Sequence, residues 1–255
     1  MTRNYAPQAT VRQARWRSTN TPDSVARKIR AELKTGGNLE RSKSVQRFFK
    51  REAQCYGWRT ADLRRASIRW RSEILKQFDL KFLVQVADKL FTGEINEEKN
   101  TAVFLLENIT AKLGDEEFVL LESWLDRISN WSDHDALVHY LIAPMVAAEP
   151  ARAKSVFRWA KAQDRWHRRA ACVALIQGTR QRLFFPEIIK LSDQLLSDHD
   201  DMVQKGLGWL LRETAKANAA RTVRYLMLIR TWAPRLVLRT ACETLPAAMK
   251  KRILA

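Results

Sequence analysis

The sequence predicts an all-α fold of the α-solenoid type, in which pairs of helices stack along one direction. The chain has only 8 Gly and 7 Pro among 255 residues, whereas the helix formers Leu, Ala, Arg and Lys are abundant. From Asp79 onward, helical segments follow one another in pairs joined by short capped turns, which is typical of helical-repeat proteins. A hydrophobic content of 46% supplies enough apolar surface for a sizeable core.

The N-terminal residues 1–20 are predicted to form a basic, flexible arm. They contain no acidic residue and carry four arginines, Arg3, Arg12, Arg15 and Arg17. An organelle transit peptide is the less favoured alternative, because the apolar residues are few and lack a helical period. Order should begin at the N-cap Thr21 and its following Pro22, and residues 21–255 are expected to form one domain.

Three helices should follow the arm, over residues 22–35, 39–56 and 60–75. The second and third carry the densest basic faces of the chain, namely Arg41, Lys43, Arg47, Lys50 and Arg51, then Arg64, Arg65, Arg69 and Arg71. Arg47 and Arg51 are predicted to contact phosphates. The remaining helices are predicted at 79–91, 96–113, 115–129, 132–147, 150–163, 165–177, 184–197, 199–217, 219–231 and 234–250.

Charge and composition narrow the class of partner. The 45 Lys and Arg against 28 Asp and Glu give a net charge of +17, which favours a polyanion, and nucleic acid is the first choice. No segment has an apolar run long enough to span a membrane. The sequence has no Gly-rich phosphate-loop motif, so no nucleotide cofactor is expected. We expect no metal, because the four histidines are scattered. Cys55, Cys172 and Cys242 read as reduced core residues of an intracellular protein.

The sequence NWSDHD at 130–135 suggests a helix start, with Ser132 as N-cap and Asp135 as its capping-box partner behind Trp131. A weak internal repeat extends this pattern: Asp135, Arg169 and Lys205 are 34 and 36 residues apart. Residues one repeat apart lie side by side in a solenoid, so these three should form a stripe on neighbouring helices. Trp209 and Arg212 lie one and two turns beyond Lys205, close to the same stripe. Most other tryptophans, including Trp124, Trp159 and Trp232, are expected to be buried.

Three segments resemble a known family. NWSDHD (130–135), DRWHRRAA (164–171) and VQKGLGWLLRETAK (203–216) are similar to the DNA alkylation repair glycosylases of the AlkD type, and the last segment is the most specific. A looser likeness runs from about Leu39 to WAPR (232–235). The resemblance implies HEAT-like helical repeats with a concave basic face.

The resemblance also implies roles for particular residues. It places the catalytic carboxylate at Asp135, sugar-contacting indoles at Trp131 and Trp209, and a DNA-contacting arginine at Arg169. A tyrosine of the family falls on Phe48, which keeps the ring and loses the hydroxyl. Lys205 and Arg212 are candidate DNA contacts on the same stripe.

The implied reaction is hydrolysis of the N-glycosidic bond of cationic N3- or N7-alkylated purines in duplex DNA, without deep base flipping. Such a base is already a good leaving group, so a carboxylate that stabilises the cationic sugar is sufficient and no cofactor is needed. The alternatives are a noncatalytic protein that binds branched or damaged DNA, or a protein-interaction scaffold. Asp135 and Arg169 could also form a purely structural ladder between repeats. The protein is expected to be a monomer in the cytoplasm, acting at the bacterial nucleoid.

Overall fold

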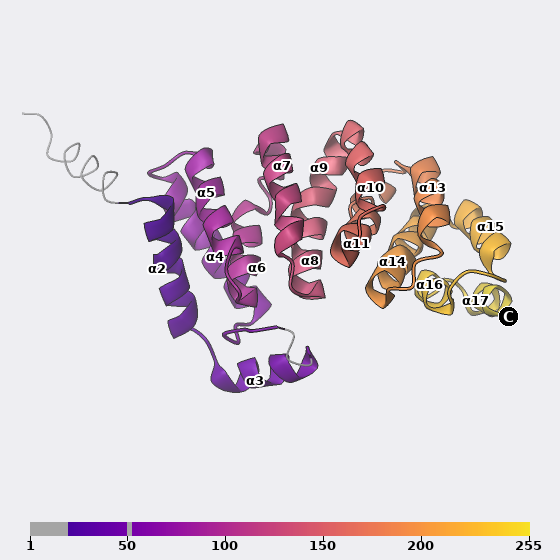
Figure 1. Ribbon diagram of the computed structural model, residues 1–255, viewed down its shortest axis with the longest axis horizontal. Coiled ribbons are helices and arrows are strands. Elements are labelled where there is room, and N and C mark those ends of the chain that lie inside the picture. Colours follow the sequence, from indigo (N-terminus) through magenta and orange to yellow (C-terminus); the bar gives the residue numbers. More distant parts are fainter. Residues whose placement is uncertain (1–19, 50–52) are drawn as a thin grey trace, which may run out of the picture. The chain divides into compact units, whose positions relative to one another are not determined.

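The computed structural model describes residues 20–49 and 53–255. The predicted arm therefore lies outside the described residues except for Asn20, and so does Arg51. The described chain consists of helices and their connections, with one isolated bridge between Gln54 and Ile95. The all-α prediction is confirmed (Figure 1).

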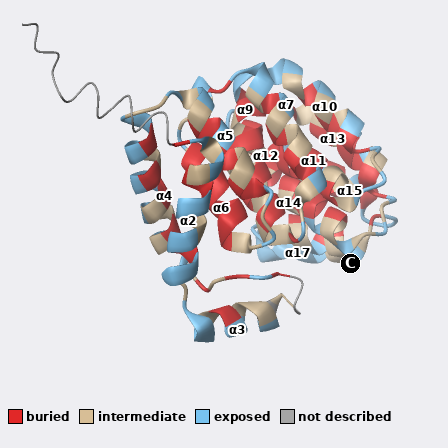
Figure 2. Cartoon of the chain, turned by 60° about the vertical axis from the view of Figure 1, so that its left-hand side comes forward, coloured by how far each residue is buried: buried red, intermediate tan, exposed pale blue. Residues whose placement is uncertain are grey.

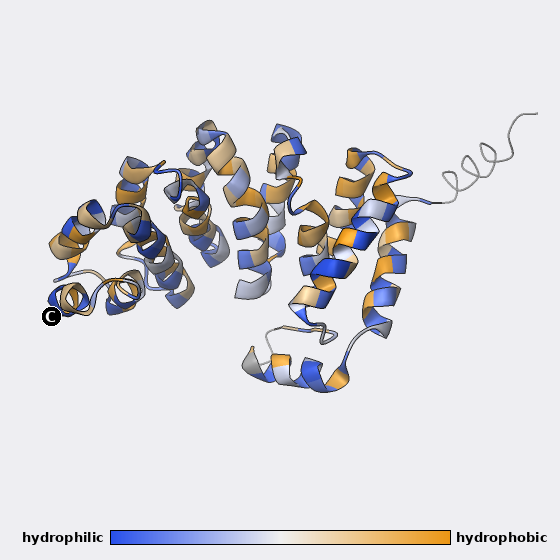
Figure 3. Cartoon of the chain, turned by 180° about the vertical axis from the view of Figure 1, so that it is seen from behind, coloured by the Kyte–Doolittle hydropathy of each residue, from blue (hydrophilic) through white to orange (hydrophobic). Residues whose placement is uncertain are grey.

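The chain divides into two compact units, Met1–Glu107 and Asn108–Ala255. Each unit has its own buried core, and most helices turn an apolar face inward and a polar face outward (Figure 3). The expectation of one domain over 21–255 stays a prediction, because this division concerns compactness alone.

Unit 1 contains five described helices: α2 (Pro22–Thr35), α3 (Leu39–Phe48), α4 (Thr60–Leu75), α5 (Leu80–Phe91) and α6 (Asn96–Leu106). Thr21 caps α2 as predicted, through a hydrogen bond from the backbone N–H of Ser24. The central helix α6 is buried along nearly its whole length (Figure 2), and α2, α4 and α5 pack around it.

The predicted helix over 39–56 is wrong at its C-terminal end. Helix α3 ends at Phe48, and residues 53–59 form a connection that leads into α4. The buried carboxylate of Glu97 holds this connection, since it accepts hydrogen bonds from the backbone N–H groups of Tyr56, Gly57 and Trp58. A partner 40 residues away along the chain thus stabilises a loop that local helix propensity does not predict.

Unit 2 contains the remaining elements. They are η1 (Thr110–Lys112), α7 (Asp115–Ser123), η2 (Trp124–Arg127), α8 (Trp131–Leu137), η3 (Val138–Ile142), α9 (Ala143–Ala148), η4 (Pro150–Arg152), α10 (Ala153–Trp159), α11 (Arg165–Val173), α12 (Ile176–Thr179), α13 (Phe185–Leu195), α14 (Asp201–Ala217), α15 (Ala219–Ile229), α16 (Arg235–Ala241) and α17 (Ala247–Leu254). Helix α11 contacts α8 and α14, and α14 contacts α16, so α8, α11, α14 and α16 succeed one another as neighbours. This is the solenoid arrangement that the sequence predicts.

Two further expectations for unit 2 are wrong. The predicted helix over 234–250 is two helices, because Pro246 lacks an N–H and starts α17 instead of continuing α16. Trp232 is 60% exposed, since it lies in the turn before α16. Trp124 and Trp159 are buried as expected, and all three cysteines are buried and unpaired.

Candidate active site

Helix α8 begins one residue earlier than the sequence suggests, and its N-cap is Asn130 instead of Ser132. The Asn130 side-chain oxygen accepts from the backbone N–H groups of Ser132 and Asp133, at 2.9 and 3.2 Å. Its amide nitrogen donates to the buried carboxylate of Asp133. The predicted capping box of Ser132 and Asp135 is therefore wrong. Because Asn130 satisfies the helix start, the Asp135 carboxylate is available for other contacts.

Asp135 forms a two-pronged ion pair with Arg169 of the neighbouring helix α11. Arg169 Nε donates to Asp135 Oδ1 at 3.0 Å, and Arg169 Nη2 donates to Oδ2 at 2.8 Å. The third guanidinium nitrogen, Nη1, donates to the backbone carbonyl of Met202 at the start of α14. The Arg169 side chain is only 7% exposed, whereas that of Asp135 is 22% exposed. The arginine is thus an internal support, and the Asp135 side chain is partly exposed to solvent.

A histidine supports the same carboxylate. His134 Nδ1 lies 2.7 Å from Asp135 Oδ1, and His134 Nε2 lies 3.1 Å from the backbone oxygen of Trp166. The His134 side chain is completely buried and its ring packs beside that of Trp166. His134 is not among the site residues predicted from the sequence, although its position next to Asp135 was a signal that could have identified it.

These contacts set the charge of the site. Burial by itself raises the pKa of Asp135, but the hydrogen bonds from His134 and Arg169, together with the Arg169 charge, more than offset it and lower the pKa to about 2. Complete burial lowers the pKa of His134. Asp135 is therefore an anion at neutral pH, beside a neutral imidazole and a cationic guanidinium.

The third member of the predicted stripe lies on α14. A Cβ atom built on Gly206 would lie 3.1 Å from Arg169 Cγ, so this glycine allows the close approach of α14 and α11. Lys205 is next to it and exposed. The succession of α8, α11 and α14 confirms the predicted order of Asp135, Arg169 and Lys205 on neighbouring helices.

Trp209 is half-buried one turn further along α14, where its ring centroid lies 5.4 Å from that of His139. His139 belongs to η3, a π-helical turn that directly follows α8. Such turns change which side chains share a helix face and are frequent at functional sites. His139 Nδ1 is buried without a hydrogen-bond partner among the described residues. Burial and the charge of Arg180 lower the pKa of His139. His139 is also absent from the site residues predicted from the sequence, although it follows Asp135 by four positions.

The other predicted site residues differ in accessibility. Trp131 is half-buried at the first position of α8. Arg212 is held by two carboxylates, Glu213 and Glu243. Arg47 is exposed on α3, and only the backbone of Phe48 is described. The DNA-contacting roles of Arg169, Lys205, Arg212, Phe48, Arg47 and Arg51 stay predictions.

Several cations of the predicted basic faces also have internal partners. On α4, Arg64 pairs with Glu107, Arg69 pairs with Glu32, and Arg71 donates to a backbone carbonyl. Some of the cations that contribute to the net charge of +17 are therefore engaged by partners within the protein.

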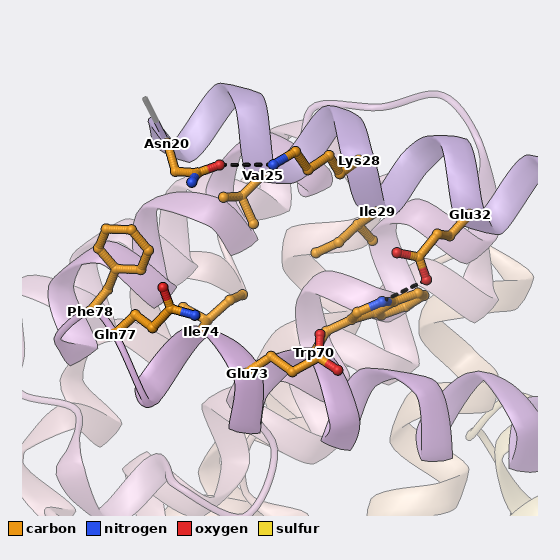
Figure 4. Close-up of a pocket in the computed structure, with 10 residues that line it drawn as sticks. All are labelled: Asn20, Val25, Lys28, Ile29, Glu32, Trp70, Glu73, Ile74, Gln77 and Phe78. Atoms are coloured by element: carbon orange, nitrogen blue, oxygen red, sulfur yellow. Dashed lines mark hydrogen bonds between the residues drawn. The ribbon is translucent and has the colours of Figure 1, made fainter. Parts of the chain in front are cut away.

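Unit 1 contains a separate pocket of about 260 Å³ between α2 and α4 (Figure 4). Val25 and Ile29 line it from α2, and Trp70 and Ile74 line it from α4. Two pairs of its polar groups are hydrogen-bonded: Trp70 Nε1 donates to Glu32, and Lys28 donates to Asn20. None of these residues is a predicted site residue, and the Asp135 carboxylate with its partners lies in unit 2.

The described residues contain neither a metal-binding cluster nor a helix that could span a membrane. Residues 20–49 and 53–255 hold no group of three or more His, Cys, Asp or Glu side chains that could bind a metal ion. Within the same ranges, no helix combines the length and the apolar character that crossing a membrane requires.

Fold and site together define an all-α, strongly basic protein with an ionised carboxylate at Asp135 and a half-buried indole at Trp131, one helical turn earlier on α8. The particular family follows from comparison with known proteins. The model of the DNA alkylation repair enzyme family matches residues 29–245, and the chain belongs to this family. Its role is accordingly in the repair of alkylated DNA, with DNA as substrate.

A solved structure described as a predicted DNA alkylation repair enzyme from Enterococcus faecalis has a similar fold. The TM-score is 0.75 at 17% sequence identity, and the match covers 83% of this chain and 97% of that chain. At this identity the similarity concerns the fold alone. Among curated proteins, no sequence matches the chain significantly.

Proposed function

We propose that the protein is a monofunctional DNA glycosylase that hydrolyses the N-glycosidic bond of cationic N3- and N7-alkylated purines in duplex DNA. The observation that carries the proposal is the Asp135 carboxylate, which is ionised, partly exposed and fixed in place by Arg169 and His134. Family membership supplies the class of substrate, alkylated DNA.

The chemistry requires a fixed negative charge beside the sugar. As the bond from C1′ to the base nitrogen breaks, its electron pair moves to the cationic base, which leaves as a neutral molecule. The sugar becomes oxocarbenium-like, and the Asp135 anion stabilises it. A water oxygen then bonds to C1′ and releases one proton, which leaves an abasic site. The half-buried indoles of Trp131 and Trp209 are proposed to pack on the deoxyribose and stabilise its cationic character through their faces.

This mechanism predicts a particular substrate selectivity. A cationic base needs no proton from the enzyme in order to leave, and the proposed reaction uses no general acid. Neutral lesions such as uracil or 8-oxoguanine leave as anions unless they are protonated. They should therefore be poor substrates, and deep extrusion of the damaged nucleotide is not part of the proposed mechanism.

The deciding experiment measures base release from a duplex with a single N7-methylguanine under single-turnover conditions. We expect Asp135→Asn to slow release on the order of 100-fold or more, because the amide is isosteric but uncharged. The affinity of the variant for the duplex should stay within about threefold of wild type, since phosphate contacts dominate binding.

The glycosylase proposal is overturned if the wild type binds duplexes with N7-methylguanine or 3-methyladenine but releases neither base. The noncatalytic binder would then be the better description.

We also propose that the protein acts as a cytoplasmic monomer at the bacterial nucleoid, where its three thiols would stay reduced.

A further inference from the structure

The hydrogen bonds around Asp135 distinguish its two carboxylate oxygens. Oδ1 accepts from both His134 Nδ1 and Arg169 Nε, whereas Oδ2 accepts only from Arg169 Nη2 among the described residues. A carboxylate oxygen has about two lone-pair sites. Oδ1 is therefore saturated, and Oδ2 has one site left. The oxygen that can meet a further partner is Oδ2.

The surroundings of His134 indicate which of its two ring nitrogens carries the hydrogen. Both ring nitrogens face acceptors, the Asp135 carboxylate at 2.7 Å and the Trp166 carbonyl at 3.1 Å. A neutral imidazole carries one N–H. The hydrogen is more stabilised in the shorter contact with the anion, so it resides on Nδ1. Burial lowers the pKa of His134 and outweighs the opposing effects of the Asp135 carboxylate and the Trp166 carbonyl. The charge of Arg169 lowers the pKa further, in favour of the neutral ring.

We propose that His134 is a positioning residue for the reaction: with Arg169 it fixes the Asp135 carboxylate so that Oδ2 is the oxygen presented to the sugar and the attacking water. This inference rests on the proposed glycosylase function. His134 itself is completely buried and cannot touch the substrate. Its contribution passes through Asp135, whose orientation it restricts and whose ionised form it stabilises.

Two substitutions separate the hydrogen bond from the packing of the ring. His134→Leu keeps an apolar side chain of similar size without a donor. His134→Asn retains an N–H close to the position of Nδ1. We expect His134→Leu to slow single-turnover release of N7-methylguanine on the order of 10- to 100-fold, the rate equivalent of one hydrogen bond to a charged group. His134→Asn should stay within about threefold of wild type.

The pH profile provides the readout that packing alone would not change. Activity needs ionised Asp135, so it is lost as the pH falls through the pKa of this carboxyl. The groups that face Asp135 are His134 on α8, Arg169 on α11 and His139 on η3. Removal of the His134 donor raises the pKa of Asp135, and the acid limb of His134→Leu should therefore lie at a higher pH than that of wild type or His134→Asn. All three proteins should bind the duplex with the same affinity.

A matched control is His167→Leu. His167 also lies beside carboxylates, Asp164 and Asp126, but contacts neither Asp135 nor Arg169 among the described residues. This variant should keep the wild-type rate and acid limb. The proposal is overturned if His134→Leu keeps the wild-type rate and pH profile. It is also overturned if His134→Asn is as slow as His134→Leu.

Nuclear magnetic resonance tests the proposal independently of activity. Nitrogen-15 spectra of the wild type should show a hydrogen on His134 Nδ1 at neutral pH, and carbon-13 titration should show a higher pKa for Asp135 in His134→Leu. A ring that carries its hydrogen on Nε2 alone would overturn the proposal, even if His134→Leu fails to fold. If the wild type releases no base, the glycosylase proposal fails, whereas these spectra still decide whether His134 positions Asp135.

Discussion

At the scale of single residues, the central finding is that Arg169 acts as a structural partner of Asp135. All three of its guanidinium nitrogens donate to acceptors inside the protein, two of them to the carboxylate. Family resemblance predicts a DNA contact for this residue. Its burial favours a role in which it holds the carboxylate ionised, and the two roles have different experimental consequences.

We expect Arg169→Lys to slow base release on the order of 10- to 100-fold, because an ammonium group cannot reproduce the paired hydrogen bonds of a guanidinium. Loss of these bonds also raises the pKa of Asp135, so the acid limb of the pH profile should move to higher pH. Release of N7-methylguanine between about pH 4 and 8 measures the rate and shows whether the acid limb of the variant has moved into this range. The wild-type rate should show no acid limb there, because the pKa of Asp135 is about 2.

Arg168→Lys is the matched control. Arg168 is the adjacent residue on α11, and it donates to Asp198 and to backbone carbonyls away from Asp135. This variant should lose stability without a change in the acid limb. If Arg169→Lys instead weakens DNA binding and keeps the limb in place, Arg169 is a DNA contact.

At the scale of elements, two glycines in α14 allow its neighbours to approach closely. Gly206 faces Arg169 of α11, and Gly208 faces Thr240 and the Val237 carbonyl of α16. Glycine within a helix costs about 1 kcal/mol relative to alanine. At both positions, tight packing between successive helices offsets this cost.

The two glycines should respond differently to alanine. A Cβ on Gly208 would lie 2.5 Å from Thr240 Cβ and 3.0 Å from a backbone oxygen, neither of which can move easily. Gly208→Ala should therefore destabilise the protein by about 1 to 3 kcal/mol. At Gly206 the nearest atom is Arg169 Cγ at 3.1 Å, a side-chain atom that has to move by only a few tenths of an ångström.

We expect Gly206→Ala to change the free energy of unfolding by less than about 1 kcal/mol but to lower the rate of base release, because a displaced Arg169 carries Asp135 with it. Urea denaturation measures the first quantity and single-turnover release the second. Equal destabilisation by the two variants would show that the α11 contact is as rigid as the α16 contact.

At the scale of the whole molecule, the net charge of +17 predicts binding that depends strongly on salt. Affinity for an undamaged duplex should fall at least about tenfold between about 50 and 200 mM salt. Lys205 is exposed on α14, next to Gly206, which faces Arg169. Lys205→Ala should therefore reduce the slope of log affinity against log salt by about 0.9.

Lys154→Ala on α10 removes the same charge from a helix outside the α8, α11 and α14 series, and should leave the slope unchanged. Fluorescence anisotropy of a labelled duplex measures all three proteins. A reduction of equal size in both variants would mean that the phosphate contacts do not favour the Lys205 position.

The sequence by itself determined the helical class, the solenoid order of α8, α11 and α14, and the proximity of Asp135 to Arg169, because helix period, capping residues and repeat spacing are local or regular signals. It failed where a distant partner competes with local propensity. Glu97 holds the backbone of residues 56–58 in a connection, where the sequence predicted helix as far as residue 56. A second error was local, because Asn130, two residues before Ser132, is the N-cap of α8.

Only the tertiary structure decided the function-bearing details. It buried His134 against Trp166, turned Arg169 inward and left one oxygen of Asp135 with an unused lone pair. The sequence could list these side chains but not assign their partners, because hydrogen bonds and pKa shifts depend on distances and burial that arise only when separate helices pack together.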